Sequence, residues 1–445
     1  LEAASLAYFG HLPNDLEAAQ ISLLIAIPQN PNSRVPSIEN VERLRTSRNH
    51  IATILEQKNK LPISEMESLE SAVFNKNVPH YLLPFPRECP HLAMMLKNKI
   101  QAGERLYTTL DRDIQATARA IMEKNRDSYK QKGINNGAII IVDKTSFEFR
   151  ALVGNFDFWD DEDAQKIPAF SVERSAGSTL KPFLYAQGID LGIANPARKM
   201  KDIPISFHGY RPKNYSEKFS GMVSLEDSLS LSLNIPFIQL LDEISLDEFL
   251  RILRRSGISR FMKQRHRLGL SVAVGLELTP IELNQGYLTL ANYGLYQRPH
   301  FLDEDHKNRD ELEQELLGVP LQNEEVFSKA STWLTEKALQ KRDRPDFPSQ
   351  SDYTGKKRPL AWKTGTSFGF HDAWTSGWGE KYVTTVWFGN LDYSSSSSLI
   401  GSEIAGTIFF DLMEQLEKPF LRKPAPPDLI PFEVCAYSGL IPTEA

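Results

Sequence analysis

The stretch GAIIIVDKTSFEFRALVG, residues 137–154, contains two runs typical of β-strands. The runs are rich in Ile, Val and Phe, which favour the pleated, half-buried surface of a strand. Only Thr145 and Ser146 separate them. A break of this length between two such runs indicates a tight turn. The stretch therefore predicts an antiparallel β-hairpin.

Three more strand-like runs follow far along the chain, at LAWKTGTS (360–367), HDAWTSGWG (371–379) and YVTTVWFGN (382–390). Glu380 and Lys381 join the last two in a second hairpin signal. The pattern from about 175 to 345 is mostly helical. Two strands before a helical insertion and three after it can close into one sheet. We therefore expect an α+β domain, with a five-stranded antiparallel sheet flanked by helices.

The segments on either side of this domain have a different pattern. NDLEAAQISLLIAIPQNP (14–31) and SIENVERLRTSRNHIATILEQ (37–57) each predict an amphipathic helix. The Pro-rich passage NVPHYLLPFPRECPHL (77–92) interrupts the helical pattern. A further helix is expected to be capped near Thr109 or Asp111. We expect a helical region at 1–75, a linker region at 76–135, the α+β domain at 136–420 and a C-terminal linker at 421–445.

Composition narrows the class of protein. The 445 residues carry a net charge of −6, with 41 % apolar and 24 % charged residues, a balance typical of globular domains. No long basic run suggests a nucleic-acid partner. Cys89 and Cys435 are too few for a disulfide framework or a structural zinc site, and their pairing is not predictable. We assign no metal or cofactor, and interpret the acidic run DFWDDEDA (157–164) as a solvated loop rather than a cation site.

Two features of the sequence bear on membrane attachment. No apolar run approaches the ~18 residues that a membrane span needs. The sequence starts at Leu1, without a Met or a signal peptide. We expect a fragment from which an N-terminal anchor or export signal is missing.

Ser178 and Lys181 form the first candidate chemical cluster, in RSAGSTLKPFLYA (174–186). Serine is a favoured helix N-cap, and Pro182 must lie within a first helical turn, so Ser178 can be a cap. Residues three apart share a helix face, so the Lys181 amine can also reach the Ser178 hydroxyl. A helix N-terminus would stabilise an oxyanion formed beside it. The functional hypothesis is that Ser178 is a nucleophile and Lys181 is its base.

Two further clusters follow in the chain. Ser232 and Asn234 lie at the junction of two predicted helices, where the alternative interpretation is ordinary loop polarity. Another Ser-x-Asn occurs at 47–49, on a predicted helix. Lys363, Thr364, Gly365 and Thr366 lie in a predicted strand, where the glycine indicates either a bulge or a close approach of another backbone. An extended substrate can add to such a strand through main-chain hydrogen bonds.

The order Ser-x-x-Lys, Ser-x-Asn, Lys-Thr-Gly is typical of penicillin-binding proteins and class A β-lactamases, which have Ser-Asp-Asn where this chain has Ser-Leu-Asn. The sequence resembles a class A penicillin-binding protein nearly end to end. TTLDRDIQ (108–115), SLSLNIPFIQLL (230–241), LTPIELNQGYLTLANYG (278–294) and WKTGTSFGFHDAW (362–374) are similar to its transpeptidase region. EAASLAYFG (2–10) and SLLIAIPQNP (22–31) are similar to the C-terminal lobe of a lysozyme-like, family 51 glycosyltransferase.

The resemblance implies a serine β-lactamase-like transpeptidase fold, preceded by a helical remnant of the glycosyltransferase domain. It also implies D-Ala-D-Ala stem peptides as substrates, β-lactams as covalent inhibitors, and a place at the periplasmic face of the inner membrane. Cell-wall synthesis proteins are then possible partners. The family's glycosyltransferase glutamates belong to motifs upstream of EAASLAYFG, so this fragment is expected to lack chain-polymerising activity.

The residues give a chemical scheme. Ser178 would attack a peptide carbonyl, and Lys181 would act as its base. A free lysine has a pKa of ~10.4, so burial or a second cation such as Lys363 must lower it to ~7–8. Ser232 would pass the proton to the leaving amine, and Asn234 would hold Lys181 or the substrate amide.

The resemblance adds roles for the backbone and for the strand hydroxyls. It implies an oxyanion hole from the N–H groups of Ser178 and Thr366, with the hydroxyls of Thr364 and Thr366 on the substrate carboxylate. The acceptor stays open, since D,D-carboxypeptidase or β-lactamase activity would use water. A β-lactam sensor or a scaffold that does not turn over remains the non-enzymatic alternative.

Overall fold

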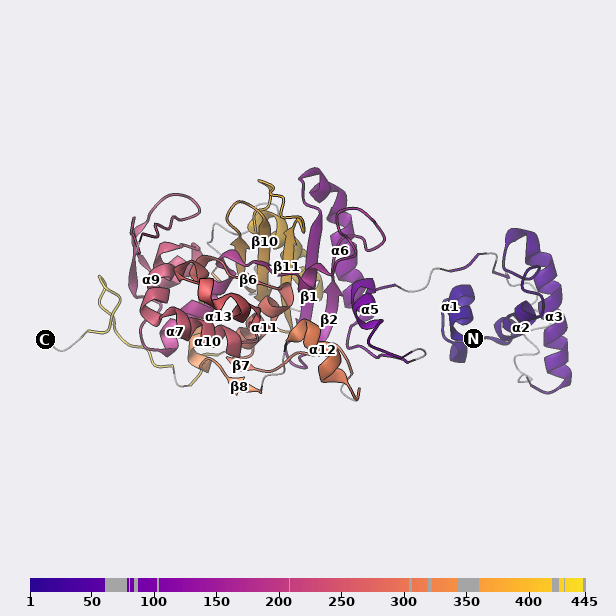
Figure 1. The fold of residues 1–445 in the computed structure, drawn as a ribbon. Helices are drawn as coiled ribbons and strands as arrows, with labels where there is room; N and C mark the ends of the chain where they lie inside the picture. Colours follow the sequence, from indigo (N-terminus) through magenta and orange to yellow (C-terminus); the bar gives the residue numbers. More distant parts are fainter. Residues whose placement is uncertain are drawn as a thin grey trace. The chain divides into compact units, whose positions relative to one another are not determined.

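The computed structural model describes the chain except for residues 61–77, 80, 84–86, 102–103, 208, 304–305, 319–321, 342–343, 345–359, 418–423, 428 and 443–445. The chain divides into two compact units, residues 1–87 and 88–445. Figure 1 shows the helices of the first unit and the sheet with its surrounding helices in the second.

The first unit is helical, as predicted. It contains α1 (Glu2–Phe9), α2 (Ala18–Ala26) and α3 (Val41–Gln57). The helix expected near Asn14 begins later, because the side chains of Glu17 and Gln20 form a capping box at the start of α2. Leu23 and Leu44 are buried together between α2 and α3.

The sheet of the second unit confirms the predicted architecture. Its strands are β1 (Asn136–Asp143), β2 (Phe149–Val153), β9 (Ala361–Thr366), β10 (Asp372–Trp378) and β11 (Tyr382–Gly389). Their order is β2-β1-β11-β10-β9, and every neighbouring pair is antiparallel. Both predicted hairpins are present. Strand β9 is the last strand of the sheet, so one of its edges is not paired within the sheet.

Helices cover both faces of this sheet (Figure 1). Ile139 and Ile141 of β1 face α6 (Arg112–Gln131) and α14 (Thr407–Leu416). Ile140 and Val142 face α7 (Lys181–Asp190) and α11 (Pro280–Ala291). Alternate side chains of a strand point to opposite faces, so β1 is buried throughout and reads as a continuous apolar run.

The other elements surround this core. The remaining helices are α5 (Pro90–Leu96), α8 (Leu225–Ser230), α9 (Ile235–Ile244), α10 (Leu246–Arg255), α12 (Arg309–Leu317) and α13 (Lys329–Leu339). Three short antiparallel pairs join β3 (Arg174–Ser175) to β6 (Glu277–Leu278), β4 (Lys199–Asp202) to β5 (Gly221–Ser224), and β7 (Leu295–Tyr296) to β8 (Glu324–Glu325).

Helix α6 lies inside the region that the sequence assigned to a linker. Asp111 caps it by accepting hydrogen bonds from the backbone N–H groups of Asp113 and Ile114, each at 3.0 Å, which confirms one of the two predicted caps. Because its apolar face packs on the sheet, residues 88–135 belong to the second compact unit rather than to a separate connection.

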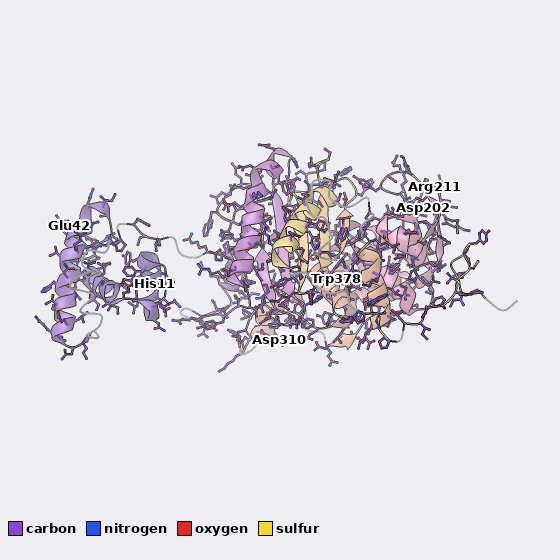
Figure 2. All side chains as sticks on the ribbon, turned by 180° about the vertical axis from the view of Figure 1, so that it is seen from behind. His11, Glu42, Asp202, Arg211, Asp310 and Trp378 are labelled. Carbon is purple, nitrogen blue, oxygen red and sulfur yellow. The ribbon has the colours of Figure 1, made fainter. Side chains whose placement is uncertain are left out.

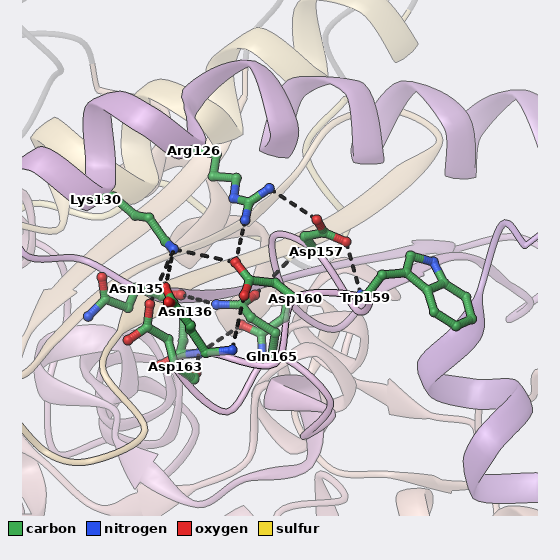
Figure 3. A network of polar contacts seen from close by, with 11 residues as sticks. Arg126, Lys130, Asn135, Asn136, Asp157, Trp159, Asp160, Asp163 and Gln165 are labelled. Carbon is green, nitrogen blue, oxygen red and sulfur yellow. Dashed lines mark hydrogen bonds and ion pairs between the residues drawn. The ribbon is translucent and has the colours of Figure 1, made fainter.

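The acidic run at 157–164 is a loop with several exposed residues, as expected, and three of its aspartate carboxylates also pair with basic side chains of α6 (Figure 3). Arg126 donates to Asp157 at 3.0 Å and also binds Asp160. The Lys130 ammonium lies 3.4 Å from both Asp160 and Asp163. These cations balance the carboxylates, and no cluster suited to a metal ion occurs in the part of the chain that the structure describes.

The structure also shows the state of the two cysteines and whether a described helix could span a membrane. Cys89 and Cys435 are both free thiols. Among the described residues, no helix has the length and apolar character needed to cross a bilayer.

Candidate active site

Ser178 lies in a tight turn between β3 and α7. Residues Gly177–Leu180 form one 3₁₀ turn, and the α-helix begins at Lys181. The N-cap position of α7 is Leu180, without a side-chain cap, so the interpretation of Ser178 as the helix cap is wrong. The Ser178 side chain is half-buried.

Two glycines allow this turn to lie directly on β9. Gly177 has φ +55°, and a Cβ there would lie 2.9 Å from the carbonyl oxygen and 3.0 Å from the nitrogen of Thr366. A Cβ on Gly365 would lie 2.5 Å from the carbonyl oxygen of Ala176. The β9–β10 register runs without a shift, so Gly365 marks a close backbone approach rather than a bulge.

Lys181 is fully buried, and two oxygens accept hydrogen bonds from its amine. The Nζ atom donates to the backbone carbonyl of Ser232 at 2.7 Å and to Oδ1 of Asn234 at 2.8 Å. The aromatic ring of Phe237 lies 5.8 Å from the same nitrogen. Burial penalises the charged form of a lysine, whereas the two oxygen acceptors and the aromatic ring stabilise it.

Lys363 approaches Ser232 from β9. Its Nζ donates to the Ser232 hydroxyl at 2.8 Å and to the Thr364 carbonyl at 3.0 Å, and its side chain is also fully buried. The structure therefore brings together four of the predicted residues, Lys181, Ser232, Asn234 and Lys363, with Ser232 between the two lysines. The Ser178 turn is joined to the same strand by the glycine contacts.

Ser232 has an unusual backbone. It lies directly after α8, with φ +56°. Its N–H donates to Leu229 O at 3.1 Å, and the N–H of Leu233 donates to Ser228 O at 3.0 Å. These two bonds form a Schellman motif, in which glycine usually occupies the left-handed position. The strained conformation places the hydroxyl of Ser232 on Lys363 and its carbonyl on Lys181.

The strand hydroxyls differ in their surroundings. Thr364 is almost entirely buried, with 7 % of its surface exposed. Thr366 Oγ1 accepts a hydrogen bond from the N–H of Gly401 at 2.9 Å. A hydroxyl held in this way can still donate its own proton, so it can serve a carboxylate oxygen as a donor.

A buried ion pair next to the Ser178 turn was missed by the sequence analysis. Arg174 Nε donates to Asp372 Oδ1 at 2.8 Å, and both side chains are almost completely buried. Asp372 also accepts from Trp387 Nε1 at 3.0 Å. The Arg174 guanidinium lies 3.9 Å from the ring centre of Tyr393. The pair ties the strand before Ser178 to β10. An arginine directly before Ser-Ala-Gly-Ser was the only available signal.

A five-stranded antiparallel sheet flanked by helices, with the turn of the Ser-x-x-Lys motif packed on its edge strand, is the arrangement expected of penicillin-binding transpeptidases and serine β-lactamase-like proteins. Residues 137–414 match the family model described as the penicillin binding protein transpeptidase domain. The chain belongs to this family and is a class A penicillin-binding protein.

Relatives agree with this assignment. The chain is 28 % identical to penicillin-binding protein 1C of Escherichia coli (strain K12) over 393 residues, covering 88 % of this chain and 48 % of that protein. It is 26 % identical to penicillin-binding protein 2D of Bacillus subtilis (strain 168), covering 94 % of this chain and 62 % of that protein. The chain thus spans about half to three-fifths of the length of these relatives.

Solved structures share the fold. Penicillin-binding protein 1A from Haemophilus influenzae superposes with a TM-score of 0.66 at 17 % identity, over 100 % of this chain and 87 % of that one. PonA1 from Mycobacterium tuberculosis, in complex with penicillin V, gives a TM-score of 0.60 at 20 % identity, over 79 % of this chain and 97 % of that one.

Proposed function

We propose that this chain is a serine D,D-transpeptidase that forms an acyl-enzyme with D-Ala-D-Ala stem peptides and cross-links peptidoglycan. The convergence of Lys181 and Lys363 on Ser232, beside the turn that carries Ser178, is the observation that carries the proposal. Ser178 attacks the carbonyl of the terminal peptide bond, and the leaving D-Ala departs as an amine.

Lys181 is the base in this scheme. A neutral amine has two N–H donors and one lone pair. The Ser232 carbonyl and Asn234 Oδ1 accept from this nitrogen at 2.7 and 2.8 Å, which accounts for two donors. The lone pair can then accept the proton of the Ser178 hydroxyl, one helical turn earlier. Of the two roles considered for Asn234, these contacts favour holding Lys181.

Ser232 relays the proton that Lys181 took from Ser178 to the leaving group, so that its own hydroxyl is restored. Its hydroxyl accepts from Lys363 at 2.8 Å, which orients the Ser232 proton away from Lys363. The N–H groups of Ser178 and Thr366 stabilise the oxyanion, and the hydroxyls of Thr364 and Thr366 hold the terminal carboxylate. The close packing of Gly177 on Thr366 supports this pairing of donors.

The regional assignment is part of the proposal. Residues 1–75 represent the C-terminal lobe of a family 51 glycosyltransferase, and the parent protein is bifunctional and acts at the periplasmic face of the inner membrane. Within residues 1–60 the three helices are consistent with that lobe. A lipid-linked disaccharide polymerisation assay on the whole protein tests it.

Covalent labelling tests the central proposal. Intact-protein mass should rise by one penicillin after incubation, and the Ser178→Ala variant should stay unmodified. An unchanged wild-type mass, or equal labelling of the variant, refutes the proposal. Product analysis with a free D-amino acid then separates transpeptidation from D,D-carboxypeptidase or β-lactamase activity. Persistent acylation without turnover of any D-Ala-D-Ala substrate supports a sensor.

A further inference from the structure

The side-chain oxygen, the side-chain nitrogen and the backbone N–H of Asn234 are all hydrogen-bonded. Its Oδ1 accepts from Lys181, and its Nδ2 donates to the backbone carbonyl of Lys213 at 2.7 Å. Its backbone N–H donates to Oδ1 of Asn214 at 2.8 Å. A carbonyl can only accept and an amide N–H can only donate. These partners therefore fix which end of the Asn234 amide faces Lys181.

Asn214 is fixed in turn by a buried carboxylate. It is 4 % exposed, and its Nδ2 donates to Asp202 Oδ1 and to the Lys218 carbonyl, both at 2.8 Å. Asp202 is fully buried at the end of β4, and its Oδ2 accepts the N–H of Ser220 at 2.7 Å. Figure 2 labels Asp202 and Arg211, which lie at the same end of the second unit. The segment 213–220 is thus anchored at one end on Asp202 and at the other on Asn234.

We propose that Asp202 and Asn214 are positioning residues for the base, acting on Lys181 through Asn234. The inference rests on the proposed function and assigns it two residues outside the three motifs. A buried carboxylate is costly unless it is hydrogen-bonded, and the bonds from Asn214 and from the N–H of Ser220 that offset this cost also fix the orientation of Asn214. Without that orientation, Asn214 can rotate, and Lys213 and the Asn234 amide lose their fixed places.

The consequence for the amine is specific. If the Asn234 amide turned over, Nδ2 would face Lys181, and two donors would point at each other. The neutral amine would then direct its lone pair at Asn234 instead of at the Ser178 hydroxyl. Acylation would slow because the proton acceptor is misdirected, while the strand hydroxyls and backbone donors proposed to bind the penicillin would stay in place.

A charge swap tests the proposal in the full chain. Asp202→Asn should slow the acylation step of a fluorescent penicillin about tenfold, and Asn214→Asp, which sets two carboxylates against each other, about 100-fold. The double variant Asp202→Asn/Asn214→Asp should recover to within about tenfold of wild type, because the amide at position 202 can donate to the carboxylate at position 214. The rate of acylation should fall while the dissociation constant of the non-covalent complex stays unchanged.

Asn195→Ala is the matched control. Asn195 also makes three bonds to the backbone, with Gly439 O at 2.8 Å and the N–H groups of Ala197 and Arg198 at 2.9 and 3.0 Å. This variant should lose thermal stability without slower acylation. Three outcomes would overturn this inference but not the proposed function. They are equal slowing of acylation in Asn195→Ala, no recovery of the rate in the double variant, and a wild-type rate in Asn214→Asp. A wild-type chain that never labels at Ser178 instead refutes the proposed function.

Discussion

Replacing Ser232 with glycine should stabilise the chain relative to the alanine variant and still remove rapid acylation. The residue has φ +56°. A left-handed backbone costs a non-glycine residue roughly 1–2 kcal/mol, and glycine loses about 0.5–1 kcal/mol through its freedom in the unfolded chain. Ser232→Gly should therefore be more stable than Ser232→Ala by about 0.5–1 kcal/mol. At about 2–4 °C per kcal/mol this corresponds to roughly 1–4 °C in Tm.

Both variants lose the hydroxyl that lies 2.8 Å from Lys363 Nζ. General acid–base groups contribute about 10²–10⁴-fold to rate, so both variants should acylate more slowly by that factor and to the same extent. Thermal unfolding of the two variants side by side, with stopped-flow acylation, measures both effects. An alanine variant at least as stable as the glycine variant would refute the strained backbone. A glycine variant with a wild-type rate would refute the role of the hydroxyl.

Three other perturbations follow from the packing. Gly365→Ala should slow acylation about 100-fold, since its Cβ would lie 2.5 Å from a backbone oxygen. Gly269→Ala is the control, because a Cβ there would have no atom within 4 Å. Equal acylation rates in the two variants would contradict the close approach at Gly365. Asp372→Ala should cost about 3–5 kcal/mol in denaturant unfolding, because it leaves Arg174 buried without its carboxylate; a loss under about 1 kcal/mol would contradict this. Burial lowers the pKa of His91 below 6.5, so the unfolded chain binds more protons and stability should fall as pH drops below 6.5. His91→Asn should flatten this dependence, which Tm measured from pH 7.5 to 5 would show.

Both hairpins of the sheet could be predicted from short patterns because each is local in the sequence, whereas the pairing of β1 with β11 joins distant parts of the chain. The run from Gly137 to Gly154 covers nearly all of both strands of one hairpin, although residues 144–148 rather than two residues connect them. The run of Ile and Val in β1 is buried on both faces because helices cover the sheet on both sides. Its continuous apolar character therefore marked a central strand rather than an edge strand.

The finer geometry of the site depends on long-range contacts, which no local pattern contains. Arg174 and Asp372 are 198 residues apart, and Asn234 meets Asn214 across 20 residues. The left-handed Ser232 was also not predictable, because serine rarely takes a position where glycine is favoured. Such a residue is retained only where the surrounding structure compensates for the strain, here by its two lysine contacts.

The two lysines explain why one serine must be strained. Both amines contact Ser232, one at its carbonyl and one at its hydroxyl, and both are fully buried. Two buried positive charges so close to one residue raise the free energy of each other's charged form. The neutral form of one amine relieves this, and the proposed mechanism assigns that form to Lys181, the base. A relaxed backbone at position 232 would turn either the carbonyl away from Lys181 or the hydroxyl away from Lys363. Only one of the two lysines could then keep its hydrogen bond to Ser232. The strained backbone is thus what allows Lys181 and Lys363 to bind on either side of Ser232.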